Sequence, residues 1–390
     1  MTLTKDGQRH QALLHLGPQV AEAFATDPDP LAVLAEELGP GPFSLVCLFV
    51  SPVGDFSELV TAASARFGEA QVMACTTAGE IGRAGYVEER VVAVGFPAET
   101  FSTAAVMIRE LSSRDAQAFG DRLVRERLTL SEQAPDRPNA FAFLLVDGLS
   151  LKEDILAAAL SPALGGMPMF GGSAGDGVDF ARTRVALNAE VAQDAAVLAL
   201  VRTALPIRVF SINHLLPTEE RMVVTEADPT ARIVKAINAE PAAREYARIV
   251  GKDPDQLDTF TFAAHPVVVR IGGEHHVRAI QRVTDAGELQ FFSAIDEGMV
   301  LTVAHKQDIV SHLEEELSAL AREEAPLSIL GCDCLLRRME AEQAQAVRGL
   351  SDTLSRHKVS GFSTYGEQFG PLHVNQTMTG VAFYPPEEAV

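Results

Sequence analysis

The sequence has no tryptophan, and aromatic residues make up only 6% of its 390 residues. Because proteins bind single-stranded nucleic acid largely through exposed aromatic side chains, this scarcity disfavours that class of partner. Positive charge is also scarce, since 32 basic residues stand against 53 acidic ones and give a net charge of −21. Nucleic acids and anionic membranes both require a basic face, so we expect neither as a partner.

Cysteines are few, and long apolar runs are absent. Four cysteines are too few for a disulfide framework in a chain of this length, which indicates a reducing compartment. No apolar run approaches the length of about 18 residues that suggests a membrane-spanning helix, and the first residues lack the apolar core of a signal peptide. The sequence therefore predicts a cytoplasmic, globular protein, with 47% hydrophobic residues to form its core.

What the sequence does contain is an internal repeat. A shift of 96 residues (141 − 45) places the apolar run 45–50 on the run 141–146. A helix-like segment follows each run, and a second apolar strand follows each helix. Then TAGE at 77–80 falls on SAGD at 173–176 without a gap. We expect the segments 43–97 and 140–202 to share one strand–helix–strand path.

A looser third copy lies near the C-terminus, with predicted strands at 327–331 and 359–362, a helix at 340–356 and TYGE at 364–367. We call the three hydroxyl–x–Gly–acid motifs the boxes. Glycine permits a sharp strand exit, and the acid can accept hydrogen bonds from the chain or from a ligand. The alternative is that each box is only a structural turn. As ligand-binding candidates the boxes supply Thr77, Gly79, Glu80, Ser173, Gly175, Asp176, Thr364, Gly366 and Glu367, with Asn375 nearby.

These patterns predict an α/β fold of repeated strand–helix–strand units in layered sheets, with an antiparallel α+β insert in the C-terminal half. We expect a helical arm at 1–42, a first domain at 43–204 and a second domain at 220–390, with the boundary near 205–219. Within the insert we expect paired strands at 221–225 and 233–237 and a helix from 240 to 250. An amphipathic helix follows at 308–322.

Catalytic motifs are missing: there is no P-loop, no GxSxG and no HExxH. We therefore expect no enzyme, although an unrecognised enzyme stays as an alternative because catalytic partners can be distant in sequence. Cys332 and Cys334 share one face of a strand, where they could supply two metal ligands. The sequence favours small buried structural side chains instead, because Cys47 and Cys75 lie far away and their spacing does not supply the other ligands, but it leaves the metal role open.

At these motifs the chain resembles the FIST family of bacterial sensory domains, in both its N-terminal and C-terminal parts. The resemblance rests on ACTTAGEI at 74–81, FGGSAGD at 170–176, VVTEAD at 223–228, NAEPAAREY at 238–246 and GFSTYGE at 361–367. The segment CDCLLRR at 332–338 is most similar to the NosP-type branch. That resemblance implies a haem-binding nitric oxide sensor that regulates a histidine kinase or a cyclic-di-GMP enzyme. An alternative is a FIST sensor of another small molecule, such as an amino acid.

The resemblance implies haem b, bound without covalent attachment because the sequence has no CxxCH. His214 is the first candidate for the iron ligand, since it lies in an apolar segment at the predicted domain boundary. His373, beside the third box, is the second. Either histidine could instead have a purely structural role. The expected partners are a small-molecule or gas ligand and a signalling protein such as a histidine kinase, and a homodimer is left open.

Overall fold

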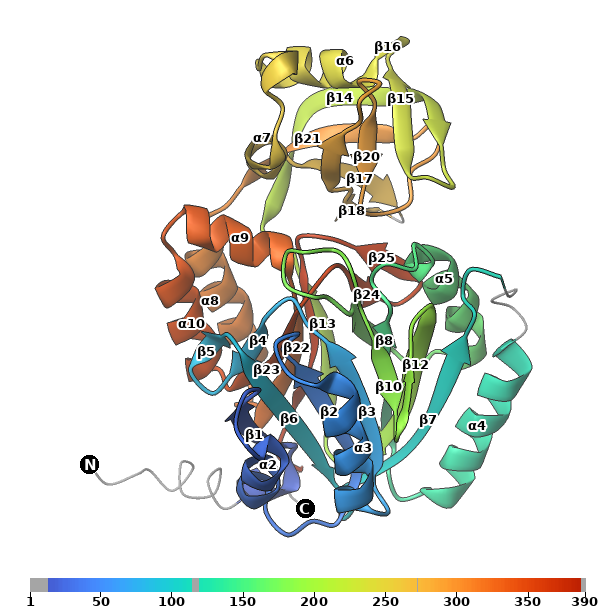
Figure 1. Cartoon of the computed structure of the whole chain (residues 1–390), viewed down its shortest axis with the longest axis vertical. Helices are drawn as coiled ribbons and strands as arrows, with labels where there is room; N and C mark the ends of the chain where they lie inside the picture. The colour runs from blue at the N-terminus through green and yellow to red at the C-terminus, as the bar shows by residue number, and fades with distance from the viewer. Residues whose placement is uncertain (1–12, 114–118, 272, 387–390) are drawn as a thin grey trace.

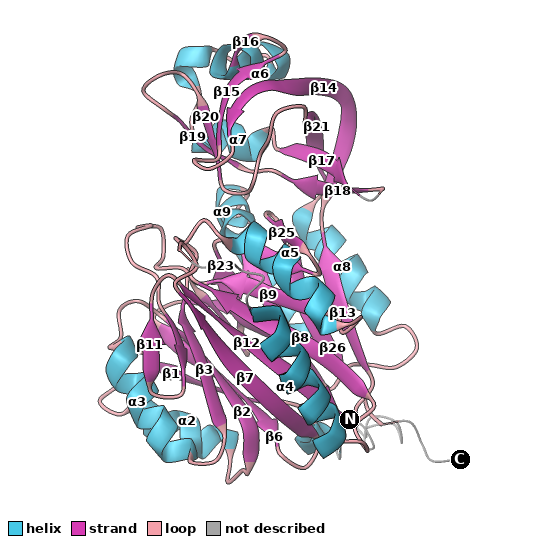
Figure 2. Cartoon of the chain, turned by 90° about the vertical axis from the view of Figure 1, so that its right-hand side faces the viewer, coloured by secondary structure: helices cyan, strands magenta, loops and turns pink. Residues whose placement is uncertain are grey.

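Three six-stranded sheets form the body of the molecule, and an eight-stranded sheet forms a smaller domain above it (Figure 1). The computed structural model describes residues 13–113, 119–271 and 273–386. Helices lie on the outer faces of the body, as Figure 2 shows from the side. The mixed layers of helices and strands confirm the predicted α/β class. None of the helices in these ranges is both long enough and apolar enough to cross a membrane.

The first repeat follows the path that its sequence predicts. Its first two strands are parallel neighbours joined by a helix, and its last strand returns antiparallel. Both parallel strands are largely buried, because other layers cover both faces of the sheet. Asp55 begins the helix by accepting a hydrogen bond from the amide of Glu58 at 3.0 Å. The elements are β2 (Phe43–Val50), α3 (Phe56–Phe67), β3 (Gln71–Thr76), β4 (Glu80–Gly82), β5 (Gly85–Val87) and β6 (Arg90–Pro97).

The second and third repeats have the same order, which confirms the predicted common path. The second comprises β8 (Asn139–Val146), α5 (Glu153–Leu164), β9 (Met169–Ser173), β10 (Val185–Leu187), β11 (Glu190–Ala192) and β12 (Ala195–Thr203). The third comprises β22 (Ser328–Cys334), α9 (Leu335–Gln343), α10 (Val347–Arg356), β23 (Val359–Thr364), β24 (Glu367–Phe369), β25 (Leu372–Val374) and β26 (Met378–Phe383).

A leading strand also precedes each repeat and pairs with the closing strand of that repeat. These leading strands are β1 (Gln19–Phe24), β7 (Phe101–Arg109) and β13 (Ile207–Ile212). The body is completed by η1 (Leu14–Leu16), α2 (Pro30–Leu38), α4 (Gly120–Gln133) and α8 (Ile309–Leu320).

Each repeat places its hairpin on the sheet of another repeat. The hairpin β4–β5 pairs with β23 of the third repeat, β10–β11 pairs with β3 of the first, and β24–β25 pairs with β9 of the second. The three exchanges form a closed cycle, so the repeats have an approximate threefold arrangement. No repeat completes its sheet alone, and the three interlock into one body.

The core of the body lies where the three sheets face one another. Each repeat contributes a phenylalanine to its centre: the rings of Phe49 and Phe362 stack at 4.6 Å, and Phe143 lies 6.4 Å from Phe49. Separate apolar clusters lie between each sheet and its outer helices. This layering holds the ends of the central strands in fixed positions.

Residues 215–306 form the smaller domain, which we call the inserted domain, between β13 and α8. It has its own apolar core. The paired strands predicted near 221–225 and 233–237 are confirmed, as are the helix ending at Val250 and the buried face of α8. Its elements are β14 (Leu215–Asp228), β15 (Ile233–Ile237), β16 (Glu240–Pro241), α6 (Ala242–Val250), η3 (Pro254–Gln256), α7 (Thr259–Ala264), β17 (Val267–Ile271), β18 (Glu274–Val277), β19 (Ile280–Val283), β20 (Leu289–Phe291) and β21 (Val300–Lys306).

Three segments differ from the sequence-based expectation. The expected helical arm, 1–42, also contains a strand, β1, which pairs with β6. Residues 1–12 of this arm lie outside the described ranges. The expected linker 205–219 contains β13 and the start of β14, because 207–212 alternates and pairs with β26. The single helix expected at 340–356 is two helices, α9 and α10, and α9 begins directly after β22.

Candidate functional site

The three boxes meet at the centre of the body, where β3, β9 and β23 end. Backbone hydrogen bonds join them in a closed ring, which we call the central ring. The bonds run from the Ala78 amide to the Ser363 carbonyl at 3.0 Å, from the Gly175 amide to the Thr76 carbonyl at 3.0 Å, and from the Tyr365 amide to the Ser173 carbonyl at 3.2 Å. Residues far apart in the sequence therefore share one site.

The acids of the first and third boxes are fully buried and are already bound by the chain. The hydroxyl of Thr77 donates to Glu80, and a backbone amide at the start of β6 donates to it at 3.1 Å. The hydroxyls of Thr364 and Thr377 donate to Glu367. Burial raises the pKa of Glu80 to about 7 and that of Glu367 to about 8. In this arrangement both acids stabilise the strand exits.

The acid of the second box also has partners within the chain. The hydroxyl of Tyr365 donates to Asp176, and the amides of Ala181 and Arg182 donate to it at 2.9 and 2.5 Å. Burial raises the pKa of Asp176, but these hydrogen bonds outweigh that effect and lower it overall. Asp176 therefore anchors the loop after the second box as an ionised group.

A buried polar cluster lies beside the third box. The Gln368 Nε2 atom lies 3.0 Å from Ser173 Oγ and 3.1 Å from His373 Nδ1. His373 and Asn375 pack against Gly366, where a Cβ atom would lie within 2.3 Å of the imidazole. Among the described residues, Gln368 Oε1 and Asn375 Oδ1 have no hydrogen-bond partner. The structure thus brings Ser173, His373 and Asn375 together and adds Gln368.

The inserted domain contacts the body close to this cluster. Arg232 lies in the inserted domain, and its Nη2 donates to Glu153 at 2.7 Å and to Asp154 at 3.0 Å, both at the start of α5. The rings of Phe180, from the body, and Phe292, from the inserted domain, lie 5.9 Å apart. These contacts place the inserted domain against the body next to the central ring.

A cavity of about 260 Å³ opens beside the first box, and we call it the Arg338 cavity. It brings the first box together with the loop after the second box and with α9. Its lining comprises Ser51, Pro52, Ala78, Gly79, Glu80, Glu88, Glu89, Gly177, Val178, Leu335, Arg338, Met339 and Glu342. Of the predicted site residues, Gly79 and Glu80 line it.

Arg338 is the only cation of this lining, and its side chain is 7% exposed. Its Nη2 donates to Glu88 at 2.7 Å, and its Nε lies 3.5 Å from Glu342. Its Nη1 lies against Gly79 and, among the described residues, has no hydrogen-bond partner. Glu88 and Glu342 are 74% and 53% exposed, so solvent-facing carboxylates hold a buried guanidinium.

His214 lies where the chain enters the inserted domain. Arg337 Nη1 donates to His214 Nδ1 at 2.9 Å, so Nε2 carries the proton and donates to Glu340 at 3.1 Å. Glu340 also pairs with Lys306 at 3.1 Å, and Arg337 pairs with Asp333 at 2.7 Å. Burial lowers the pKa of His214, which therefore stays neutral. Both ring nitrogens of His214 are occupied.

The four cysteines are buried. Cys332 lies in the central core with Cys47 and Cys75, and burial raises the pKa of its thiol. Burial raises the pKa of the Cys334 thiol as well. Across the described ranges no group of three or more His, Cys, Asp or Glu residues has an arrangement that could hold a metal ion. The geometry favours the structural role for Cys332.

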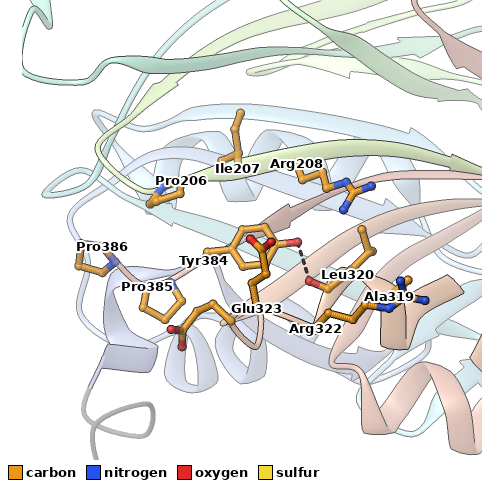
Figure 3. A pocket seen from close by; sticks show the side chains of 11 residues that line it. Pro206, Ile207, Arg208, Ala319, Leu320, Arg322, Glu323, Tyr384, Pro385 and Pro386 are labelled. Atoms are coloured by element: carbon orange, nitrogen blue, oxygen red, sulfur yellow. Dashed lines mark hydrogen bonds between the residues drawn. The ribbon is translucent and has the colours of Figure 1, made fainter. Parts of the chain in front are cut away.

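A larger cavity, of about 720 Å³, lies where β13 begins and β26 ends, away from the inserted domain (Figure 3). Tyr384 occupies its centre and donates from its hydroxyl to the Leu320 carbonyl at 3.0 Å. No box residue lines it, so we do not assign it to the site. Its lining comprises Pro206, Ile207, Arg208, Ala319, Leu320, Arg322, Glu323, Glu324, Tyr384, Pro385 and Pro386.

Sequence reasoning missed Arg338, Glu340 and Gln368. Arg338 had a usable signal, because an arginine pair follows the strand exit of β22 in the segment CDCLLRR, whereas Glu340 lies two residues beyond that segment. The signal for Gln368 was weaker, since only its position directly after the third box distinguishes it.

Comparison with protein families agrees with the internal organisation. The FIST N domain model matches residues 44–240, and the FIST C domain model matches residues 242–370. The two matches adjoin inside the inserted domain, so both contribute to the body. A search of curated proteins finds no match. The chain therefore belongs to the FIST family, whose domains are sensory, ligand-binding modules of signalling proteins rather than catalytic ones.

Proposed function

We propose that this FIST protein senses a small molecule that carries a carboxylate and an ammonium group, as an amino acid does, and binds it in the Arg338 cavity. The observation that supports the proposal is Arg338 itself. Burying a guanidinium is costly unless it is paired, and here its partners are two largely exposed carboxylates that can turn away. An incoming carboxylate can replace them in a bidentate pair.

The remaining lining suits the rest of such a ligand. Glu88 and Glu342, once displaced from Arg338, are available to an ammonium group at the cavity mouth. Val178, Leu335 and Met339 offer an apolar wall for a short side chain. The volume of about 260 Å³ lies just below the range of about 300–1,000 Å³ usual for drug-sized ligands, which favours a compact molecule.

The test is a thermal-shift screen of the twenty amino acids, with a matched set of valine, isovalerate and isobutylamine. Isovalerate retains only the carboxylate of valine, and isobutylamine retains only its ammonium group. We expect at least one amino acid to raise the melting temperature by about 3 °C at about 100 times its Kd. Either single-function analogue should bind more weakly than its parent amino acid.

Arg338→Met should abolish this shift, whereas Arg348→Met should retain it, because Arg348 is 94% exposed on α10 and does not line the cavity. Binding that survives Arg338→Met, or the absence of a shift with every amino acid, would overturn the proposal.

A second proposal is a haem-based nitric oxide sensor that acts on a histidine kinase or a cyclic-di-GMP enzyme. The similarity of residues 332–338 to the NosP-type branch supports it. His214 and His373 do not fit an iron in this arrangement. Both nitrogens of His214 are hydrogen-bonded, and a Cβ on Gly366 would lie 2.8 Å from His373 Nε2.

Titration of the purified protein with haem tests this second proposal. A Soret band that shifts in His214→Ala or His373→Ala would support it and would show that the histidine leaves its present partners. The absence of a protein-specific Soret band would reject it.

A further inference from the structure

A single helix, α9, contacts both the Arg338 cavity and the connection to the inserted domain. Figure 1 shows it directly beneath the strands that carry the chain into and out of that domain. The connection consists of residues 213–214, between β13 and β14, and residues 307–308, between β21 and α8. We call these two segments the hinge.

One face of α9 belongs to the cavity. Leu335, Arg338, Met339 and Glu342 all line it, and their spacing of three and four residues places them along one stripe of the helix. The pair of Arg338 with Glu88 joins this face to the first repeat, whereas its contact with Glu342 lies within the helix.

Another face of α9 belongs to the hinge. Leu336 packs on an apolar cluster of the inserted domain that includes Leu215. One turn further on, Glu340 accepts from His214 at 3.1 Å and pairs with Lys306 at 3.1 Å. His214 and Lys306 flank the two crossings of the chain, and the carbonyl of His214 accepts from the Gln307 amide at 2.9 Å. A single buried carboxylate therefore connects both crossings to the body.

The geometry points to α9 as the element that transmits ligand binding, an inference that rests on the proposed function of the Arg338 cavity. We propose that a ligand on Arg338 turns α9 and withdraws Glu340 from His214 and Lys306, which loosens the hinge. The contacts of Arg337 with His214 and of Arg232 with α5 remain and limit how far the inserted domain moves. Arg337 is the pivot, since its Nε pairs with Asp333 of β22 at 2.7 Å and both side chains are buried.

A small movement is sufficient for this effect. The contacts of Glu340 with His214 and Lys306 are both 3.1 Å long, near the upper limit of about 3.2 Å for an N–H···O hydrogen bond, so a helix displacement of about 1 Å breaks them. The change is discrete because a buried carboxylate without partners is unfavourable and must find new ones. Water entering the hinge supplies those partners and stabilises the open position.

Hydrogen–deuterium exchange of the full chain tests the inference at the amides of the hinge and its flanking residues, 212–216 and 304–308. Arg338→Met releases the cavity end of α9 without any ligand, and it should accelerate hinge exchange by about tenfold, an ordinary coupling between two sites. Glu340→Gln should accelerate hinge exchange by itself, and Arg338→Met should then add nothing further. Asp352→Asn is the matched control, because it removes one exposed charge from α10 and touches neither the cavity nor the hinge.

The outcomes separate the two proposals. If no amino acid binds, the ligand assignment fails, but the comparison of Arg338→Met with the double variant still tests the coupling. If an amino acid binds and hinge exchange is unchanged in the native chain, the coupling is wrong although the ligand site stands. Equal acceleration by Arg338→Met with and without Glu340→Gln would also overturn it. Should Glu340→Gln fail to fold, Lys306→Met breaks the second contact and takes its place.

Discussion

Gly79 permits the close approach of Arg338 to the first box. It has φ of +128°, and a Cβ atom there would lie 1.8 Å from Arg338 Nη1. We expect Gly79→Ala to lower the free energy of unfolding by about 1–3 kcal/mol, because alanine is strained at this φ and the guanidinium of Arg338 must also move away. Gly177→Ala is the matched control: it also has positive φ, at +75°, but nothing lies within 4 Å of its Cβ position. Urea denaturation giving equal losses for both variants would contradict the close approach.

Glu367 makes stability depend on pH. Burial raises its pKa to about 8 in the folded state, well above the ordinary value of 4.5 for a glutamate. The folded state therefore binds a proton that the unfolded state has lost, and this contribution to stability is complete below the unfolded pKa. It is lost progressively as pH rises from about 4.5 to 8.

Glu367→Gln cannot titrate, so it lacks this contribution to the pH dependence. The free energy of unfolding of the native chain should fall relative to that of the variant between pH 5 and pH 8. Urea denaturation at both pH values measures the difference, and the general repulsion of a chain with net charge −21 largely cancels in the comparison. Parallel pH profiles for the two chains would show that Glu367 is ionised throughout.

The sequence predicted which residues gather but not what they bind. The shared pattern of a hydroxyl, a glycine and an acid located the three boxes. It could not show that Thr77 and Thr364 satisfy the acids of their own boxes, because that depends on how sharply the chain turns after the strand. Arg338 approaches the first box from a helix about 260 residues later (338 − 79 = 259), a distance that no local pattern reports.

The exchanged hairpins give a prediction at the level of elements. Ile81 lies on β4 of the first repeat, yet it is fully buried in an apolar cluster with α8 and with α10 and β26 of the third repeat. We expect Ile81→Ala to cost about 2–5 kcal/mol, as other large-to-small core substitutions do. Amide exchange should accelerate in β23, the partner strand, as well as in β4.

Val53→Ala is the control for Ile81→Ala, because the Val53 side chain is 53% exposed. This control substitution should change the free energy of unfolding by less than about 0.5 kcal/mol. Native protection of β23 in the Ile81→Ala chain would mean that the exchanged hairpin does not stabilise its host sheet.

Most elements were predictable because their periodicity is local. The apolar runs of β2 and β8 and the buried stripe of α8 are examples. The exchange of hairpins was not predictable, since each hairpin strand is three residues long and pairs with a strand from another repeat. Such short segments carry too little pattern to indicate a partner.

At the level of the whole molecule, the body should be indivisible and the inserted domain removable. A fragment of residues 1–214 leaves β4 without β23 and β9 without β24, so we expect it to aggregate. Replacing residues 216–305 with a short Gly-Ser linker should preserve the body, because Leu215 and Lys306 are direct cross-strand neighbours.

Circular dichroism during thermal melting measures how cooperatively the fragment and the shortened chain unfold. The shortened chain should unfold in one cooperative transition, and the fragment should show none. A soluble fragment with a sharp transition would contradict the interlocked body. An unfolded shortened chain would show that the body depends on the inserted domain.

The cyclic exchange of hairpins also constrains how the protein is made. During synthesis β4 leaves the ribosome long before β23, the strand on which it must pair. The N-terminal part cannot finish folding first, as the earliest domains of many large proteins do. Its sheet edges stay open until the last third of the chain has emerged. We therefore expect folding to be largely post-translational, and we expect chaperones that cover strand edges to bind the nascent chain.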